Sequence, residues 1–83
     1  MSELTKEERD RGIHRLCRLL GATRADICDP MMSVLLGAPA SCPIAIERWM
    51  NWKGIGPSEG ESLAEALTRH FGKEAAELAQ RLV

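Results

Sequence analysis

The chain has 83 residues, which is room for one domain with one hydrophobic core, placed over residues 1–83. Apolar residues make up 45%, charged residues 28% and aromatic residues 4%, and the net charge is −1. This composition excludes disordered and collagen-like chains, and the balanced charge argues against strong non-specific binding to nucleic acid.

The first 21 residues predict two consecutive helical segments. Thr5 followed by Glu8 fits a capping box, which opens a charged helix that fades near Gly12. An apolar stripe with the spacing i, i+3, i+4, i+7 follows and stops at Gly21. The stripe consists of Ile13, Leu16, Cys17 and Leu20.

Two short helices and a loop are predicted next. Thr23 with Asp26 caps a single helical turn. Residues 29–37 begin with Asp-Pro, which fits an N-cap and first helical position, and end with a glycine that stops the helix. The segment 38–43, APASCP, is predicted to be a loop because two prolines interrupt it.

The remaining chain predicts three helices. One starts near Pro43 and is broken by the Gly-Ile-Gly-Pro of residues 54–57. Ser58 with Glu61 fits a second capping box, and the helix that it opens ends at Gly72, before a last helix. The apolar faces of these three helices are Ile46, Trp49 and Met50; Leu63, Ala66, Leu67 and His70; and Ala75, Leu78, Ala79 and Leu82.

We expect an all-α fold, a compact bundle of five or six short antiparallel helices, because no stretch alternates with the period of a strand. Trp49 is its largest expected core residue. The predicted core is Ile13, Leu16, Leu20, Ile27, Ile46, Trp49, Leu63, Leu67, Leu78 and Leu82.

Charge is distributed unevenly along the chain. Residues 9–24 hold five arginines and one aspartate, a net +4, whereas residues 54–68 hold three glutamates and no base, a net −3. The predicted basic face is Arg11, Arg15, Arg18 and Arg24, and the predicted acidic face is Glu59, Glu61 and Glu65. They are either two solvated faces or complementary surfaces for another protein or another copy. Trp52 is either packed or an exposed interface anchor.

The sequence gives little support for catalysis, so we expect no enzyme. The two histidines form no recognisable triad, and there is no phosphate-binding loop. Cys17, Cys28 and Cys42 are an odd number without a C-x-x-C pair, which favours reduced thiols over disulfides or structural zinc. We expect no cofactor or metal, no signal peptide and no membrane span, and a soluble cytoplasmic protein.

Two stretches resemble DNA-binding motifs. Residues 49–63, WMNWKGIGPSEGESL, resemble a helix-hairpin-helix, in which the backbone of a Gly-x-Gly turn binds a phosphate. Residues 35–49 resemble a phage-type helix-turn-helix. The alternative interpretation of residues 54–57 is a simple helix stop, because residues 54–68 carry three glutamates and no Lys or Arg.

A second resemblance covers most of the chain. Residues 13–27, IHRLCRLLGATRADI, are similar to the second and third helices of death domains. Three further features follow the order of that superfamily. They are the spacing from Ile27 to Trp49, the segment LAEAL at 63–67, and a closing helix with Leu78 and Leu82. The resemblance implies a six-helix adaptor or signalling module, as in apoptosis, that associates with a related domain or another copy. A small DNA-binding regulator and a helical inhibitor of another protein remain alternatives.

Overall fold

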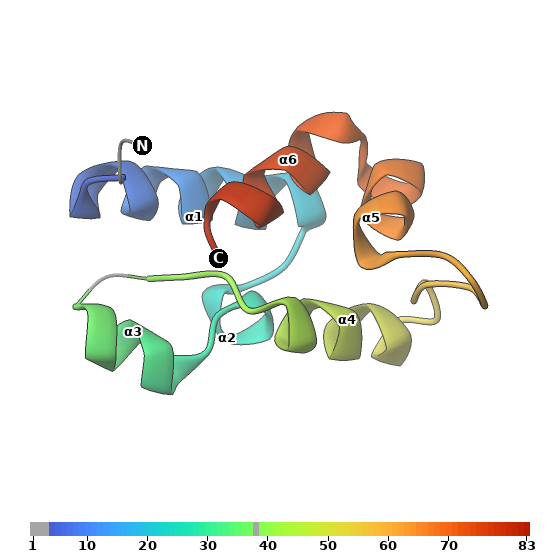
Figure 1. Cartoon of the computed structure of the whole chain (residues 1–83), viewed down its shortest axis with the longest axis horizontal. Coiled ribbons are helices and arrows are strands. Elements are labelled where there is room, and N and C mark those ends of the chain that lie inside the picture. Colours follow the sequence, from blue (N-terminus) through green and yellow to red (C-terminus); the bar gives the residue numbers. More distant parts are fainter. Residues whose placement is uncertain (1–3, 38) are drawn as a thin grey trace.

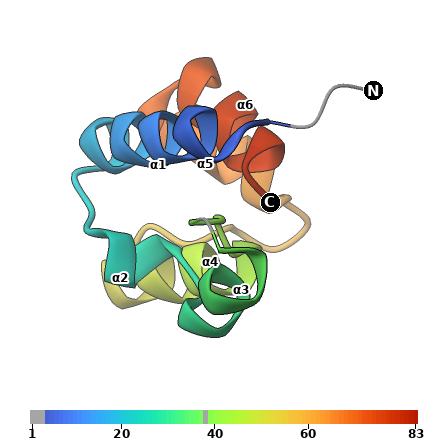
Figure 2. The same cartoon turned by 90° about the vertical axis from the view of Figure 1, so that its left-hand side faces the viewer.

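The computed structural model describes residues 4–37 and 39–83. Its helices form two layers, which lie one above the other in Figures 1 and 2. The first layer contains α1 (Lys6–Leu20), α5 (Leu63–Phe71) and α6 (Lys73–Arg81). The second layer contains α2 (Arg24–Ile27), α3 (Pro30–Leu36) and α4 (Pro43–Trp52). The predicted all-α bundle is therefore confirmed: the described residues form six helices and no strand.

Most predicted helix boundaries follow from local capping. Thr5 Oγ1 accepts from the Glu8 N–H at 3.1 Å, and the Thr5 N–H donates to Glu8 Oε1 at 2.9 Å, as the capping box requires. Asp29 Oδ1 accepts from the Met31 N–H at 2.9 Å at the start of α3. Gly37 ends that helix in the left-handed conformation, with φ 65°.

The predicted break near Gly12 is wrong, because α1 runs through this residue without interruption. A Cβ at Gly12 would lie 2.8 Å from Cδ2 of Leu82, so the glycine lets the C-terminal end of the chain approach α1 closely. The residue that resembled a helix end is therefore a packing site.

The predicted second capping box is also displaced by four residues. Ser58 and Glu61 form a separate turn, and the Ser58 N–H donates to Glu61 Oε1 at 3.0 Å. The helix starts later: Ser62 Oγ accepts from the Glu65 N–H at 3.1 Å. Gly60, with φ 78°, separates the two S-x-x-E motifs, and only the second one directly precedes the apolar stripe.

The core lies between the layers and contains most of the predicted residues. Leu63 and Leu78 are partly buried against it, and the other eight are buried. Trp49 packs against Phe71 of α5, with ring centroids 6.0 Å apart. Small residues not predicted for the core also belong to it, and they allow α5 and α6 to pack closely: Ala66, Ala75, Ala76 and Ala79.

Hydrogen bonds also join the two layers at the end of the chain. The Ser41 hydroxyl donates to the Ala79 carbonyl at 3.0 Å, and the Ser41 N–H donates to the Leu82 carbonyl at 2.9 Å. Arg9 Nη1 of α1 donates to the same Leu82 carbonyl at 3.0 Å. Ser41 belongs to the predicted loop 38–43, of which residue 38 lies outside the described residues.

No helix in the described ranges has the length and hydropathy of a membrane span. The sequence expectation of no signal peptide includes residues 1–3, which lie outside the described residues.

Candidate interaction surfaces

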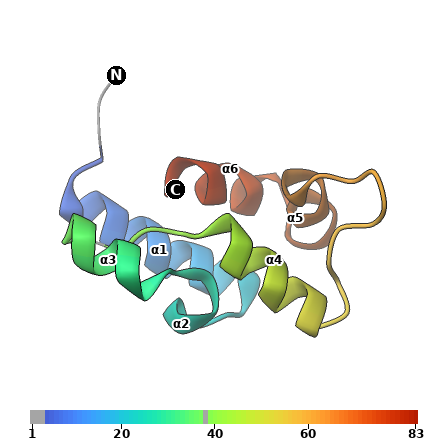
Figure 3. The same ribbon diagram turned by 60° about the horizontal axis from the view of Figure 1, so that its bottom comes forward.

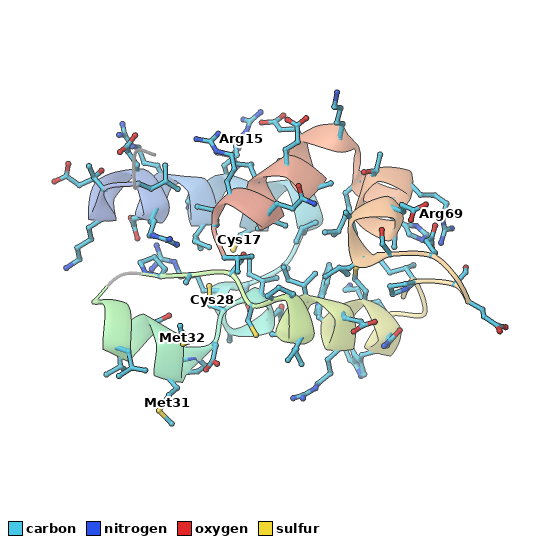
Figure 4. The ribbon with its side chains drawn as sticks, in the orientation of Figure 1. Arg15, Cys17, Cys28, Met31, Met32 and Arg69 are labelled. Carbon is cyan, nitrogen blue, oxygen red and sulfur yellow. The ribbon has the colours of Figure 1, made fainter. Side chains whose placement is uncertain are left out.

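The predicted basic face is exposed, but two of its arginines bind carboxylates of the same chain. Arg15 forms a bidentate pair with Glu74 of α6, with Nε–Oε2 at 2.8 Å and Nη2–Oε1 at 3.1 Å (Figure 4). This pair lowers the pKa of Glu74 and raises that of Arg15. Arg24 pairs with Asp10, which joins α2 to α1. The structure gives Arg11 and Arg18 no ion pair among residues 4–37 and 39–83.

The predicted acidic face is divided in the same way. Glu61 binds Arg69 through two contacts of 2.9 and 2.8 Å, which together with the Ser58 N–H lower its pKa to about 2. Glu65 Oε1 accepts from the Ser62 N–H at 3.2 Å and caps α5. Glu59 is exposed in the loop before this helix. Local structure therefore accounts for Glu61 and Glu65 without a partner protein.

An apolar surface that the sequence did not predict lies on α3. Among the described side chains of this helix none is buried, although most are hydrophobic. The exposed fractions are 70% for Met31, 42% for Met32, 80% for Val34 and 73% for Leu35. Figure 4 shows the Met31 side chain pointing away from the first layer. Exposed apolar side chains gathered on one element mark interaction sites more strongly than single ones do.

The packing around α3 is correspondingly loose. An open hollow of about 380 Å³ lies between this helix, α2 and the loop at Pro39. Its lining residues include Ala25, Cys28, Pro30 and Ser33. A helix of seven residues is marginal on its own, and α3 gains little from tertiary packing. Its stability in the chain therefore depends on the Asp29 cap, on Pro30 and on Gly37.

Helix α4 lies in the same layer as α3 (Figure 3) and also exposes apolar side chains. Ile46, Trp49 and Met50 point into the core, and the opposite side of the helix is exposed. The outer face consists of Ile44, Glu47, Arg48, Asn51 and Trp52. Ile44 is 67% exposed and Trp52 is 80% exposed, so Trp52 is not packed within the chain.

The missed surface had a detectable signal in the sequence. Residues 30–36, PMMSVLL, have helix caps at both ends but no polar face. A surface helix normally alternates an apolar stripe with a charged one, so a short helix that is apolar on all sides is either central to a core or covered by a partner. The structure decides between these two cases, because it shows whether the side chains of the helix are buried.

Cys28 is buried, and Cys17 and Cys42 are partly buried. All three are free thiols, and burial raises the pKa values of Cys17 and Cys28. These two thiols are therefore protonated and weakly nucleophilic near neutral pH. In the part of the chain that the structure describes, no group of three His, Cys, Asp or Glu side chains could hold a metal ion.

The turn proposed to bind phosphate uses two of its backbone donors internally. The Gly54 N–H donates to the Asn51 carbonyl at 3.0 Å, and the Ile55 N–H donates to the Met50 carbonyl at 2.9 Å. These bonds end α4, and they leave the two amides unavailable to an anion.

Comparison with known proteins adds no relative to this description. No family model, no curated protein and no solved structure matches the chain. The surface formed by α3 and the outer face of α4, which we name the outer surface, is the feature from which a function can be inferred.

Proposed function

We propose that the protein is a protein–protein interaction module, acting as an adaptor or signalling component, that binds its partner through the outer surface. The observation that carries this proposal is α3, which exposes Met31, Val34 and Leu35 by at least 70%. Small soluble domains rarely expose neighbouring large apolar side chains on one helix without a binding role.

Burial of this surface supplies the free energy of association. Covering one Val, Leu or Met side chain completely contributes about 1.5–3 kcal/mol, against which the loss of rigid-body freedom must be set. Trp52 adds a large aromatic side chain, a type enriched among the residues that dominate binding energy. A partner that covers α3 and Trp52 together therefore gains enough apolar contact for specific association.

The charged faces have a secondary part in this proposal. Arg11, Arg18 and Glu59 are exposed and are available to steer a partner of complementary charge. Arg15, Arg24 and Glu61 already hold intramolecular pairs. Exposed pairs contribute little affinity each, so these charges would affect the association rate and its salt dependence more than the strength of binding.

A DNA-binding regulator has less support. The outer face of α4 carries Glu47 beside Arg48, so it offers phosphate no surplus of positive charge. The amides of Gly54 and Ile55 are occupied, as described above. An inhibitor of one unrelated protein is a special case of the proposed function, in which the outer surface is the inhibitory face.

The test is site-specific photo-crosslinking in extract of the source cells. A photoreactive amino acid at Leu35 of α3 should crosslink to protein, whereas the same group at exposed Gln80 of α6 should not. Yields at Leu35 no higher than those at Gln80 would contradict the proposal. A salt-sensitive shift of duplex DNA at micromolar protein, without a protein crosslink, would favour the DNA-binding regulator instead.

A further inference from the structure

We propose that Cys17 and Cys28 form a reversible disulfide, which fastens the two layers of helices to each other when the protein is oxidised. The inference goes beyond the proposed function and does not depend on it, because it concerns the junction of the layers rather than the outer surface. Three observations carry it: the directions of the side chains at this junction, the proximity of the two thiols, and a hollow through which an oxidant reaches one of them.

The backbone around Cys28 sets the direction of its side chain. Residues 28 and 41 form an antiparallel bridge, and the Cys42 N–H donates to the Ile27 carbonyl at 2.8 Å. Bridged residues place their side chains on the same face, and the next residue along an extended segment points to the opposite face. The Ser41 hydroxyl reaches the Ala79 carbonyl of the first layer at 3.0 Å. Cys28 therefore also faces the first layer, and Cys42 does not share that face.

Cys17 lies on α1 at the edge of the buried stripe of that helix. It follows Ile13 by four residues and precedes Leu20 by three, so it lies on the same side of α1 as these two buried residues. Its thiol is partly buried against the core to which Cys28 belongs. Figure 4 shows the side chains of Cys17 and Cys28 pointing toward each other from the first and the second layer.

The electrostatics of Cys28 indicate the same proximity. Burial is the largest cause of its raised pKa, and Cys17 raises it further, because a second negative charge nearby opposes ionisation. Cys42 contributes less to this rise than Cys17 does. Arg24 acts in the opposite direction on the pKa values of both Cys17 and Cys28, so its guanidinium group lies near each of them. Two thiols from different layers thus share one site beside one cation.

An oxidant can reach this site from outside the molecule. Cys28 and Arg24 both line the open hollow of about 380 Å³ between α2, α3 and the loop at Pro39. A hollow of this size admits a molecule as small as hydrogen peroxide. Because burial keeps both thiols largely protonated near neutral pH, we expect oxidation over minutes to hours rather than within a second.

The reaction balances with hydrogen peroxide as the oxidant. The Cys28 thiolate attacks one peroxide oxygen, the O–O bond breaks, and the departing hydroxide takes up a proton to give water. The Cys17 thiolate then attacks the sulfur of the resulting sulfenic acid. The S–S bond forms, the S–O bond breaks, and a second water leaves. The two sulfur atoms together lose two electrons, which the peroxide gains, and a dithiol such as dithiothreitol reverses the oxidation by thiol–disulfide exchange.

The disulfide would join the middle of α1 to the residue that precedes the Asp29 cap of α3. It would thereby hold the start of α3 in place against the first layer. A disulfide also restricts the unfolded chain, so the oxidised protein should have a melting temperature about 10 °C above that of the reduced protein.

Peptide mapping of the whole chain identifies the bond. The protein is treated with hydrogen peroxide, its remaining free thiols are alkylated, and a protease cleaves it on the N-terminal side of each aspartate. The three cysteines then lie in separate peptides, 10–25, 26–28 and 29–83. We expect mass spectrometry to find the first two peptides joined by a bond that dithiothreitol breaks, and Cys42 alkylated.

Two serine variants test the pairing through the melting temperature, measured by circular dichroism before oxidation, after oxidation and after reduction. Cys17 and Cys42 are both partly buried, so Cys17→Ser and Cys42→Ser are matched and should both stay folded. Cys42→Ser should keep the whole rise that dithiothreitol reverses, and Cys17→Ser should lose it. Oxidation of the methionines is the same in both variants and is not reversed by dithiothreitol, so it does not affect this comparison.

Several outcomes would overturn the inference. They are three alkylated thiols after oxidation, a bond that includes Cys42, and a bond found only between two chains. A joined pair of peptides without a reversible rise in the melting temperature would also overturn it, because the layers would then not be fastened. None of these outcomes changes the crosslinking test at Leu35, so the proposed function stands or fails separately.

Discussion

Helices α1 and α3 begin and end in the same way but have opposite surroundings. Each starts with a side-chain cap, at Thr5 or Asp29, and each ends at a left-handed glycine, Gly21 or Gly37. The first helix buries three large side chains, and the second buries none of those described. Local capping thus specifies where a helix forms, whereas its burial depends on the rest of the fold. The proposed function takes α3, which has strong caps and no buried side chain among those described, as a surface that binds a partner.

The two tryptophans of α4 provide the largest test of this contrast. Trp49→Ala should destabilise the fold by about 3–5 kcal/mol, which approaches the whole stability of a small domain, because it removes a buried indole. Trp52→Ala should leave the free energy of unfolding within about 0.5 kcal/mol of wild type. Urea denaturation followed by circular dichroism, at low protein concentration, measures both. Equal losses would mean that the outer face belongs to the folded core.

Leu16 of α1 and Leu35 of α3 form a matched pair, one fully buried and the other 73% exposed. Leu16→Ala should cost about 2–5 kcal/mol because this residue is fully buried. Leu35→Ala should cost no more than about 0.5 kcal/mol in the monomer, because the exposed side chain has little contact to lose. A loss above 2 kcal/mol at Leu35, measured by urea unfolding of dilute protein, would contradict the exposed position of α3.

The smallest expected effect separates Glu61, whose carboxylate binds Arg69, from the exposed Glu59 of the same loop. The pKa of Glu61 is lowered to about 2, from an ordinary value of 4.5, chiefly by Arg69. Its ionised form therefore stabilises the folded state above pH 4.5, and this contribution is lost as the pH falls toward 2. Glu61→Gln should lower the melting temperature at pH 7 and reduce its fall between pH 4.5 and 2. Glu59→Gln, the matched control in the same loop, should change neither. Equal behaviour of the two variants in a calorimetric pH series would contradict this role of Glu61.

The parts of the fold that were predictable depend on short-range signals. The caps at Thr5 and Asp29 and the apolar spacing of Ile46, Trp49 and Met50 involve residues within one or two helical turns. The helix break predicted near Gly12 was wrong because a glycine looks the same in the sequence whether it ends a helix or lets another segment pack closely. The segment that packs against Gly12 contains Leu82, which is distant in the sequence. The helix start predicted at Ser58 was wrong because two S-x-x-E motifs lie four residues apart. Gly60, which has a positive φ, lies between their serines, and the helix starts only after Ser62.

The candidate site was less predictable for a related reason. The pair Arg15–Glu74 joins residues 59 positions apart, and helix packing alone brings them together. The exposure of Leu35 likewise reflects which elements fail to cover α3. An apolar residue in a short helix has the same sequence signature in a core and on a surface. The sequence therefore predicted the basic and acidic faces as binding surfaces and did not predict the apolar surface on α3.

The placement of the outer surface on one continuous stretch, residues 30–52, has a consequence for how such a protein can diverge. In the proposed function, recognition and folding use opposite sides of the same ten residues of α4, and recognition by α3 has little influence on the core. A handful of substitutions within a single short segment could therefore redirect the chain to a new target while its scaffold stayed unchanged. Selection for binding and selection for stability of the fold would then act on nearly separate sets of positions.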